Sequence, residues 1–288
     1  MVDHHGLFVW YELLTTDIAA AKAFYGSVVG WGAEDASTAE FAYILFTAGH
    51  GPVGGLMDLP PEARKMGATP RWVGYVAVDD VDARAEQIKQ LGGAIYVPPT
   101  DTNIGRIAVV ADPQTATLAL VKGLKLAQQR QADPDEPGCI DWHELYAADG
   151  NEAFAFYQAL FDWRETEADT RPLPSYHLFA AGGRTIGGMF TKHARVPVPF
   201  WLHYFNVGDI DTALRRVEEG GGRIALGPHD LPDNRGIARC IDPQGAMFAL
   251  QGPRTNDPAR RLPDPGIGWS SDWGDISSRG RLVVKPRS

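Results

Sequence analysis

The stretch Trp10-Tyr11-Glu12-Leu13-Leu14-Thr15-Thr16-Asp17 decides the fold, because it returns as Trp142-His143-Glu144-Leu145-Tyr146-Ala147-Ala148-Asp149. Each copy leads into a segment with a Phe-Tyr pair and then reaches a tryptophan. These landmarks are Phe24-Tyr25 and Trp31 in the first copy, and Phe156-Tyr157 and Trp163 in the second. Every landmark is displaced by 132 residues between the copies. A fixed offset of this kind indicates an internal repeat of one structural unit.

The composition is that of an ordinary globular protein with an acidic surface. The chain has 288 residues, of which 44% are hydrophobic and 22% charged, with a formal net charge of -9. This length suffices for two domains. Lysine and arginine are scattered and form no basic stripe, so no nucleic-acid partner is expected. No apolar run reaches the ~20 residues of a membrane span and no signal peptide is visible, which predicts a cytoplasmic protein without a membrane partner.

Strand and helix patterns divide the chain into similar modules. The aromatic and aliphatic run 8–14 predicts a buried strand, Asp17 suits a helix N-cap, and 18–29 has the periodicity of an amphipathic helix. Further strands follow, and the same order restarts near Trp72 and twice in the second half. We therefore predict an α+β fold of four βαβββ modules, paired into two tandem domains with curved mixed sheets around a cleft.

The domain boundaries follow from this order and from a polar, proline-bearing stretch in mid-chain. The predicted parts are domain 1 at 1–122 (modules 8–59 and 71–122), a linker at 123–137, domain 2 at 138–253 (modules 138–191 and 199–252), and a C-terminal tail at 254–288. The two cysteines, Cys139 and Cys240, do not make a disulfide framework and are expected to be reduced and buried.

The series of motifs resembles the vicinal oxygen chelate superfamily, the group of glyoxalases, bleomycin-resistance proteins and extradiol dioxygenases. The resemblance rests on the Asp-initiated helix, the Phe-Tyr pair, the Gly-Trp step and the closing Asp-Pro-Gln turns at 112–114 and 242–244. It covers about residues 8–252. Within the superfamily, the chain looks most like the two-domain glyoxalase-like proteins of actinobacteria that are often labelled as hydroxylases.

Metal-dependent members of this superfamily hold one divalent ion with His and Glu side chains from the first and last strands of paired modules. The resemblance places the corresponding positions at Trp10, Val73, Ala119, Trp142, Leu202 and Ala249, and, to within one residue, near Leu56 and Met189. None of these side chains offers the oxygen, imidazole or thiolate donors that such a cation needs. The sequence therefore predicts no metal and no cofactor, and it argues against chemistry that depends on a metal as a Lewis acid.

Side chains alternate between the two faces of a strand, so the residues that share a face with those positions should line the clefts. The predicted ligand-binding residues are Trp10, Glu12, Tyr43 and Tyr75 in domain 1, and Trp142, Glu144, Tyr146, Tyr176, Tyr204 and Asn206 in domain 2. Each cleft then offers an indole, a carboxylate and phenols. Glu12 and Glu144 are the candidate catalytic residues, since desolvation can turn a carboxylate into a general base.

Structural roles compete with these functional ones. Glu12 and Glu144 could each pair with an arginine and hold two modules together, and the tryptophans could simply fill the core. His143 and His203 fall on the helix-covered face and are expected to be structural.

The leading hypothesis is a metal-free protein that binds a small, partly apolar or aromatic molecule, for sequestration or resistance. One alternative is a hydroxylase- or lyase-like enzyme of the superfamily acting on a secondary metabolite. The other is a structural or dimerising protein with vestigial clefts. A small molecule is the expected partner, and a homo-oligomer is left open.

Overall fold

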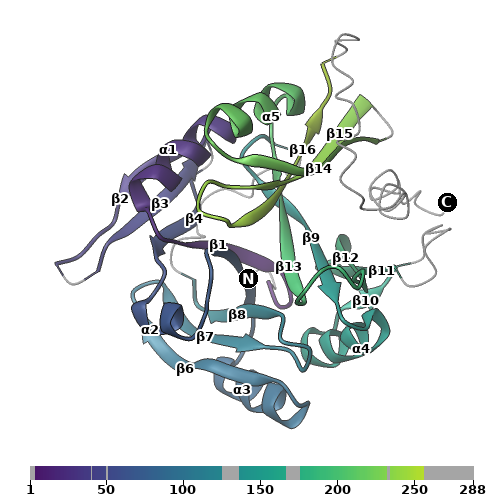
Figure 1. Cartoon of the computed structure of the whole chain (residues 1–288). Helices are drawn as coiled ribbons and strands as arrows, with labels where there is room; N and C mark the ends of the chain where they lie inside the picture. Colours follow the sequence, from purple (N-terminus) through teal and green to yellow (C-terminus); the bar gives the residue numbers. More distant parts are fainter. Residues whose placement is uncertain are drawn as a thin grey trace.

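The protein contains two open, eight-stranded mixed sheets with helices packed on one face of each. A computed structural model describes residues 4–39, 41–49, 51–124, 136–166, 176–231 and 234–255, and in these the two sheets are formed by residues 8–122 and 140–253 (Figure 1). This confirms the predicted α+β fold of four βαβββ modules in two tandem domains. The predicted linker 123–137 and tail 254–288 lie largely outside the described residues.

The first domain contains one strand and one helix that no sequence pattern indicated. Its elements are β1 (Phe8–Thr15), α1 (Ile18–Val28), β2 (Gly32–Asp35), β3 (Tyr43–Ala48), β4 (Gly51–Asp58), α2 (Pro61–Lys65), β5 (Arg71–Ala77), α3 (Val81–Gln90), β6 (Ala94–Thr102), β7 (Gly105–Ala111) and β8 (Thr117–Lys122). The four residues of β2 are all exposed at the sheet edge, so no apolar alternation marks this strand. The short α2 buries no residue either.

The second domain repeats the first, strand for strand. Its elements are β9 (Ile140–Ala147), α4 (Gly150–Phe161), β10 (Arg164–Glu165), β11 (His177–Ala181), β12 (Arg184–Thr191), β13 (Phe200–Asn206), α5 (Ile210–Glu219), β14 (Arg223–Leu231), β15 (Arg235–Ile241) and β16 (Met247–Pro253). The strand orders are β2-β3-β4-β1-β5-β8-β7-β6 and β10-β11-β12-β9-β13-β16-β15-β14. The two modules of each domain therefore join through antiparallel first strands, β1 with β5 and β9 with β13.

An aspartate side chain begins each long helix, as predicted for Asp17. The N-caps of α1, α3, α4 and α5 are Asp17, Asp80, Asp149 and Asp209, and each carboxylate accepts hydrogen bonds from backbone N–H groups of the first turn. These bonds satisfy donors that have no partner inside the helix. The repeated aspartate is thus a local folding signal, and it explains why each copy of the opening stretch ends in Asp.

The two domains pack through their helix-covered faces. Helix α1 lies beside α5, and α3 lies beside α4 (Figure 1). The phenol of Tyr25 donates to Asp242 at 3.1 Å, and the repeat-related Tyr157 donates to Asp112 at 3.0 Å. Each bond crosses from one domain to the other. The two bonds are reciprocal, as expected for domains related by an approximate two-fold axis.

The repeated tryptophans make the same kind of reciprocal contact. The indole of Trp31 donates to the carbonyl of Gly138 at 2.8 Å, and that of Trp163 donates to the carbonyl of Gly6 at 2.7 Å. The Phe-Tyr pair and the tryptophan that mark the repeat in the sequence therefore lie at the contact between the domains. Their recurrence reflects a shared interface.

His143 and His203 lie at the centre of this interface, on the helix-covered face as predicted. The Tyr11 hydroxyl and His143 Nε2 are 2.6 Å apart, and His143 Nδ1 is 3.0 Å from the carbonyl of Ile186. The His203 ring packs edge-on against Phe8 and Tyr11, and its ring nitrogens have no hydrogen-bond partner among the described residues. Burial lowers the pKa of both histidines, to about 3 for His203.

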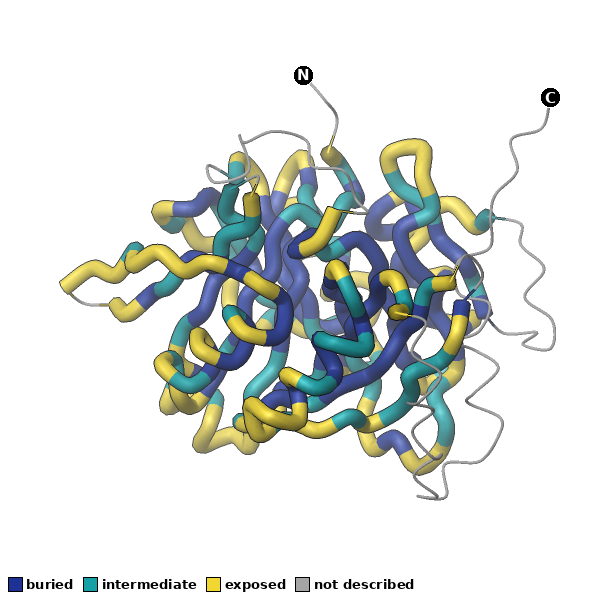
Figure 2. Tube along the Cα trace, turned by 90° about the horizontal axis from the view of Figure 1, so that it is seen from above, coloured by how far each residue is buried: buried dark blue, intermediate teal, exposed yellow. Residues whose placement is uncertain are grey.

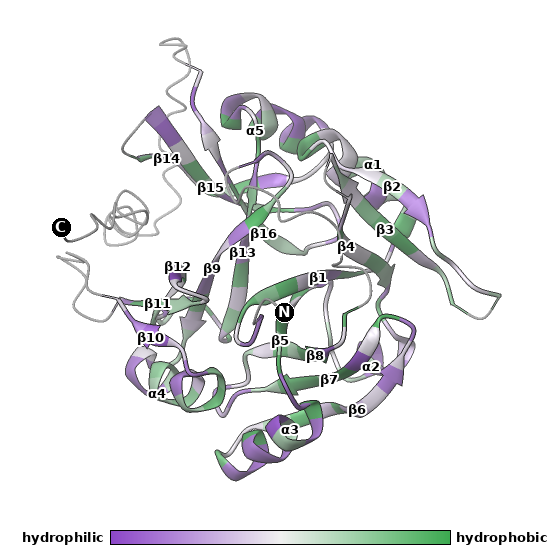
Figure 3. Cartoon of the chain, turned by 180° about the vertical axis from the view of Figure 1, so that it is seen from behind, coloured by the Kyte–Doolittle hydropathy of each residue, from purple (hydrophilic) through white to green (hydrophobic). Residues whose placement is uncertain are grey.

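Burial and hydropathy both separate the interior of the protein from its loops and outer turns. Buried residues form a continuous interior and the exposed ones gather in loops and outer turns (Figure 2). The central strands β1 and β5 carry much of the hydrophobic colour, whereas the outer turns of α3 are hydrophilic (Figure 3). Cys139 and Cys240 are buried and form no disulfide among the described residues. Among the described helices, none has the length and apolar character needed to cross a membrane.

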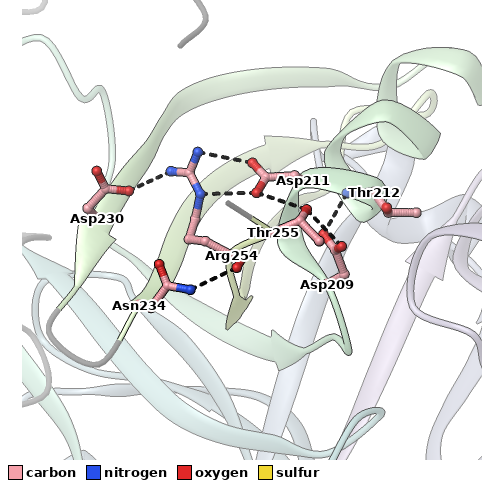
Figure 4. A network of polar contacts seen from close by, with 7 residues as sticks. All are labelled: Asp209, Asp211, Thr212, Asp230, Asn234, Arg254 and Thr255. Carbon is pink, nitrogen blue, oxygen red and sulfur yellow. Dashed lines mark hydrogen bonds and ion pairs between the residues drawn. The ribbon is translucent and has the colours of Figure 1, made fainter. Parts of the chain in front are cut away.

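The end of the second sheet is tied down by a charged network. Arg254, just beyond β16, contacts Asp211 of α5 at 3.0 Å and Asp230 of β14 at 2.6 Å (Figure 4). The neighbouring Thr255 donates to the N-cap carboxylate of Asp209 at 2.9 Å. One arginine thus joins the last strand to a helix start and an edge strand of the same module.

Candidate ligand-binding clefts

The residues predicted for the first cleft gather around one buried carboxylate. Glu12 is 8% exposed and lies on the face of β1 away from the helices, as do Trp10 and the strand partners that pack with it. Its Oε1 accepts a hydrogen bond from the Tyr43 hydroxyl at 2.7 Å, and its Oε2 accepts one from Tyr75. The structure therefore brings together all four residues predicted for this cleft, from three different strands.

Burial dominates the electrostatics of this group. It raises the pKa of Glu12, and the hydrogen bonds from Tyr75 and Tyr43 only partly oppose that rise. Burial also raises the pKa of both phenols, and the neighbouring Glu12 charge adds to the effect. A proton is thus held more tightly at each of the three oxygen-bearing groups than it would be in water.

Gly55 is what allows Tyr43 to reach Glu12. It lies directly opposite Glu12 on β4, and a Cβ at this position would overlap the Tyr43 hydroxyl. The second domain repeats the arrangement, since a Cβ on Gly188 would overlap the ring of Tyr176. A glycine at these two positions leaves room for the tyrosine to approach the strand backbone closely.

The second cleft holds an equivalent carboxylate with an added cation. Glu144 accepts from the hydroxyls of Tyr176 at 2.9 Å and Tyr204 at 2.6 Å, and from Nη2 of Arg239 at 3.2 Å. The guanidinium of Arg239 also lies over the Tyr146 ring, 5.3 Å from its centroid. Pairing of the glutamate with an arginine, the competing structural role, is therefore present in this domain.

The remaining predicted residues of the second cleft divide into two groups. Trp142 and Tyr146 pack in the same buried cluster as Tyr176 and Tyr204. Asn206 belongs to a separate polar group, in which its amide donates to Asp141 at 3.4 Å. The same carboxylate accepts from Gln251 of β16.

The two clefts differ at four equivalent positions around the carboxylate. With the residue of domain 1 first, the pairs are Leu14 and Tyr146, Met57 and Phe190, Arg71 and Phe200, and Val109 and Arg239. All four residues of domain 1 are half-buried, whereas three of the four in domain 2 are fully buried. The fourth, Phe200, stacks on Tyr146 with ring centroids 4.5 Å apart. These positions of domain 2 are thus occupied by packed rings and a buried guanidinium, while the apolar residues of domain 1 keep part of their surface accessible.

Six of the eight positions predicted to correspond to the metal ligands of the superfamily lie on the cleft faces, but their side chains are not metal ligands. Trp10, Val73 and Ala119 pack in one cluster in domain 1, and Trp142, Leu202 and Ala249 in one cluster in domain 2. An indole, aliphatic chains and methyl groups offer no ligand to a divalent cation. The described residues also contain no group of three or more His, Cys, Asp or Glu side chains placed to hold a metal. The side chains at these positions therefore do not fit a divalent metal ion.

Two of the eight predicted positions need correction. Leu56 and Met189 lie on the helix-covered faces, in the clusters behind the sheets. The register of β1 with β4 pairs Glu12 with Gly55 and Leu14 with Met57, so Gly55 and Met57 are the residues of β4 that face the cleft side, and Gly188 and Phe190 are their counterparts. A displacement of one residue along a strand moves a side chain to the opposite face of the sheet. Met57 and Phe190 carry no hard ligand atom either.

Comparison with known proteins identifies the superfamily to which the fold belongs. The model of the Glyoxalase/Bleomycin resistance protein/Dioxygenase superfamily matches residues 7–120 and 139–250. The chain belongs to this superfamily. It is 31% identical over 247 residues to a Mycobacterium tuberculosis protein named "Putative glyoxylase CFP32", with 85% of this chain and 94% of that protein covered. It is also 31% identical over 148 residues to the anthracycline biosynthesis protein DauV of Streptomyces sp. strain C5, which covers 46% of this chain and 54% of that protein.

Solved structures share the fold at low identity. A Mn(II)-bound glyoxalase from Novosphingobium aromaticivorans superposes with a TM-score of 0.59 at 16% identity, covering 86% of this chain and 82% of that one. The 2,3-dioxygenase LapB from Pseudomonas sp. KL28 gives a TM-score of 0.58 at 10% identity, covering 90% and 96%. At these identities the likeness concerns the arrangement of modules alone. The predicted resemblance to the superfamily is confirmed.

Proposed function

We propose that the protein binds a small, partly aromatic molecule in its N-terminal cleft without the help of a metal ion. The observation that carries this proposal is the difference between the clefts. Around Glu12 the residues Leu14, Met57 and Val109 keep part of their surface accessible, whereas their counterparts around Glu144 are buried. A site with apolar walls and a few convergent polar groups is the usual setting for a small ligand.

The polar groups of this cleft suit recognition of a neutral hydrogen-bonding substituent. Glu12 is held in place by Tyr43 and Tyr75, so its orientation is fixed before a ligand arrives. Preorganisation of this kind lowers the cost of binding. The neighbouring Trp10 adds flat apolar area. The relative named for anthracycline biosynthesis supports a secondary metabolite as the class of ligand.

Independence from metal is proposed from the donor set. The superfamily's ligand positions carry indole, aliphatic and methyl side chains in both domains, so the binding energy must come from apolar contact and hydrogen bonds. We expect sequestration of the ligand to be the role, because this requires nothing beyond the contacts described.

Calorimetric titration of EDTA-treated protein with the neutral probes 2-naphthol and 2-naphthamide tests the proposal. We expect saturable binding that added Zn²⁺, Mn²⁺ or Ni²⁺ does not strengthen. Tyr43→Phe should weaken it by about three- to tenfold, the effect of losing one hydrogen-bonding group, while the matched Tyr176→Phe leaves it unchanged. Absence of binding by every probe, or binding only after a metal is added, would refute the proposed function.

One observation favours an enzyme as the second candidate. Burial raises the pKa of Glu12, and a carboxyl group with a raised pKa is suited to general acid–base catalysis near neutral pH. A hydroxylase- or lyase-like activity would then depend on Glu12 and be indifferent to Glu144. Turnover of a bound metabolite that is lost in Glu12→Gln but kept in Glu144→Gln would favour this reading over sequestration.

A further inference from the structure

One cation at the N-terminal cleft has no counter-charge among the residues that the structure describes. Arg71 begins β5 and lies directly opposite Leu14 of β1, which packs with the cleft-facing cluster. Val73 and Tyr75, two and four residues further along β5, belong to that same cluster. Because strand side chains alternate, Arg71 shares their face. Its side chain is therefore directed to the side of the sheet that carries Glu12.

The guanidinium of Arg71 is half-buried and unpaired within the described part of the chain. Its Nε is fully shielded from solvent but has no hydrogen-bond partner among those residues, and no ion pair is formed there. Burial lowers its pKa while the nearby Tyr96 phenol raises it, and an arginine remains charged in either case. Shielding such a donor without a partner costs free energy, which a bound anion would recover.

Two other arginines that are buried or half-buried are paired. Arg239 has Glu144 at 3.2 Å, and Arg254 has Asp211 at 3.0 Å and Asp230 at 2.6 Å. In domain 2 the position of Arg71 is taken by Phe200, which stacks on Tyr146 and fills the cleft. An unpaired arginine therefore occurs at the cleft that keeps accessible surface, and an aromatic ring replaces it where the cleft is filled.

The spacing between Arg71 and the Glu12 group suits a short aromatic molecule. Val73 is the strand partner of Glu12, and Arg71 lies two residues from it, a separation of about 7 Å along an extended strand. One or two fused rings can bridge such a gap. The half-buried Leu14 lies between the two ends, and Tyr96, 57% exposed, adds an aromatic surface near the arginine.

We propose that the N-terminal cleft selects aromatic carboxylates, with the carboxylate bound by Arg71, the ring on Leu14 and Met57, and the far end directed at Glu12 and its tyrosines. A guanidinium matches a planar carboxylate with two parallel hydrogen bonds, which makes a carboxylate a better fit than a tetrahedral anion. This inference rests on the proposed function, since it names the class of ligand for the same cleft.

The test compares 2-naphthoate with 2-naphthamide, which differ in charge and hardly in shape. Calorimetry on the EDTA-treated full-length protein should give about ten- to hundredfold tighter binding of the carboxylate, the range expected of a charge-assisted hydrogen bond. Arg71→Gln should remove this preference and leave the affinity for the amide within about twofold. Arg71→Lys, which keeps the charge but loses the planar fork, should retain part of it.

A charge-matched control is available in the same sheet. Arg106 of β7 pairs with Asp82 of α3 at 2.6 Å, on the helix-covered face, so Arg106→Gln removes the same charge away from the cleft. We expect this variant to keep the full preference for 2-naphthoate. Thermal unfolding of each variant shows whether it is folded.

The outcomes separate this inference from the proposed function. Equal affinity for both probes, a preference that survives in Arg71→Gln, or tighter binding of 2-naphthyl phosphate than of 2-naphthoate would overturn the carboxylate assignment while small-molecule binding stands. Failure of both the charged and the neutral probes to bind would overturn the two proposals together.

Discussion

Replacing Arg239 by leucine is the perturbation that bears most directly on the difference between the two clefts. Arg239 is buried in domain 2, contacts Glu144 at 3.2 Å and covers the Tyr146 ring. The substitution leaves Glu144, which is 2% exposed, with its two tyrosine donors but without a counter-charge. Breaking a buried ion pair from one side costs about 3–5 kcal/mol, because the remaining charge stays desolvated.

Urea unfolding at pH 7, followed by tryptophan fluorescence, measures this loss as a drop in the free energy of unfolding. The double variant Glu144→Gln with Arg239→Leu removes both charges and should recover most of the loss, because a neutral amide can still bond to the tyrosine hydroxyls. The matched substitution Val109→Leu in domain 1 should change stability by less than about 1.5 kcal/mol, since its site is half-buried and uncharged.

A loss of less than about 1 kcal/mol in the free energy of unfolding of Arg239→Leu, a value typical of exposed ion pairs, would contradict this prediction. A double variant, Glu144→Gln with Arg239→Leu, that is no more stable than Arg239→Leu alone would contradict it as well. Either result would mean that Glu144 and Arg239 are open to solvent, and the second cleft would then be as suitable for a ligand as the first.

Three further predictions concern buried titratable groups. Burial raises the pKa of Glu12, so its contribution to stability is full below the pKa of the unfolded chain, near 4.3, and is lost as the pH rises through the higher pKa of the folded protein. Urea titrations from pH 4 to 8 should therefore show Glu12→Gln gaining stability relative to the wild type, by about 1.4 kcal/mol per unit of pKa difference. For His203, whose pKa burial lowers to about 3, stability is full above about pH 6.5 and falls with acidification, so His203→Leu should remove a loss of about 3 kcal/mol between pH 6.5 and 4. Tyr25→Phe should lower the free energy of unfolding by about 1–3 kcal/mol in the same assay, because it removes the hydroxyl that donates a hydrogen bond to the buried carboxylate of Asp242, and Tyr157→Phe should have a similar effect. A change below about 0.5 kcal/mol in both variants would contradict the interface described.

The sequence was sufficient for the fold because each module carries its own local signals. Asp17 and its three counterparts cap helices through contacts only three residues away, and the alternation in 8–14 identifies the faces of one strand. Glu12, Tyr43 and Tyr75 could be assigned to one face for the same reason. Signals of this kind involve residues that are close in the sequence, so they can be recognised without knowledge of the tertiary structure.

The partners of Glu144 and Tyr25 could not be predicted, because they belong to other modules and lie far away in the sequence. Glu144 meets Arg239 across 95 residues of sequence, and Tyr25 meets Asp242 across 217. No periodicity links such positions. The difference between Arg71 and Phe200 was visible as a substitution in the repeat, but its meaning depends on Tyr146 filling the second cleft.

Fluorine NMR of protein labelled with 5-fluorotryptophan tests the central claim most directly. The chain has eight tryptophans, and the resonances of Trp10 and Trp142 can be assigned from Trp10→Phe and Trp142→Phe. Titration with 2-naphthoate in the presence of EDTA should shift the Trp10 resonance saturably and leave that of Trp142 in place. A saturable shift of Trp142 without Trp10, or a shift of Trp10 that requires a divalent metal, would contradict binding by the N-terminal cleft alone.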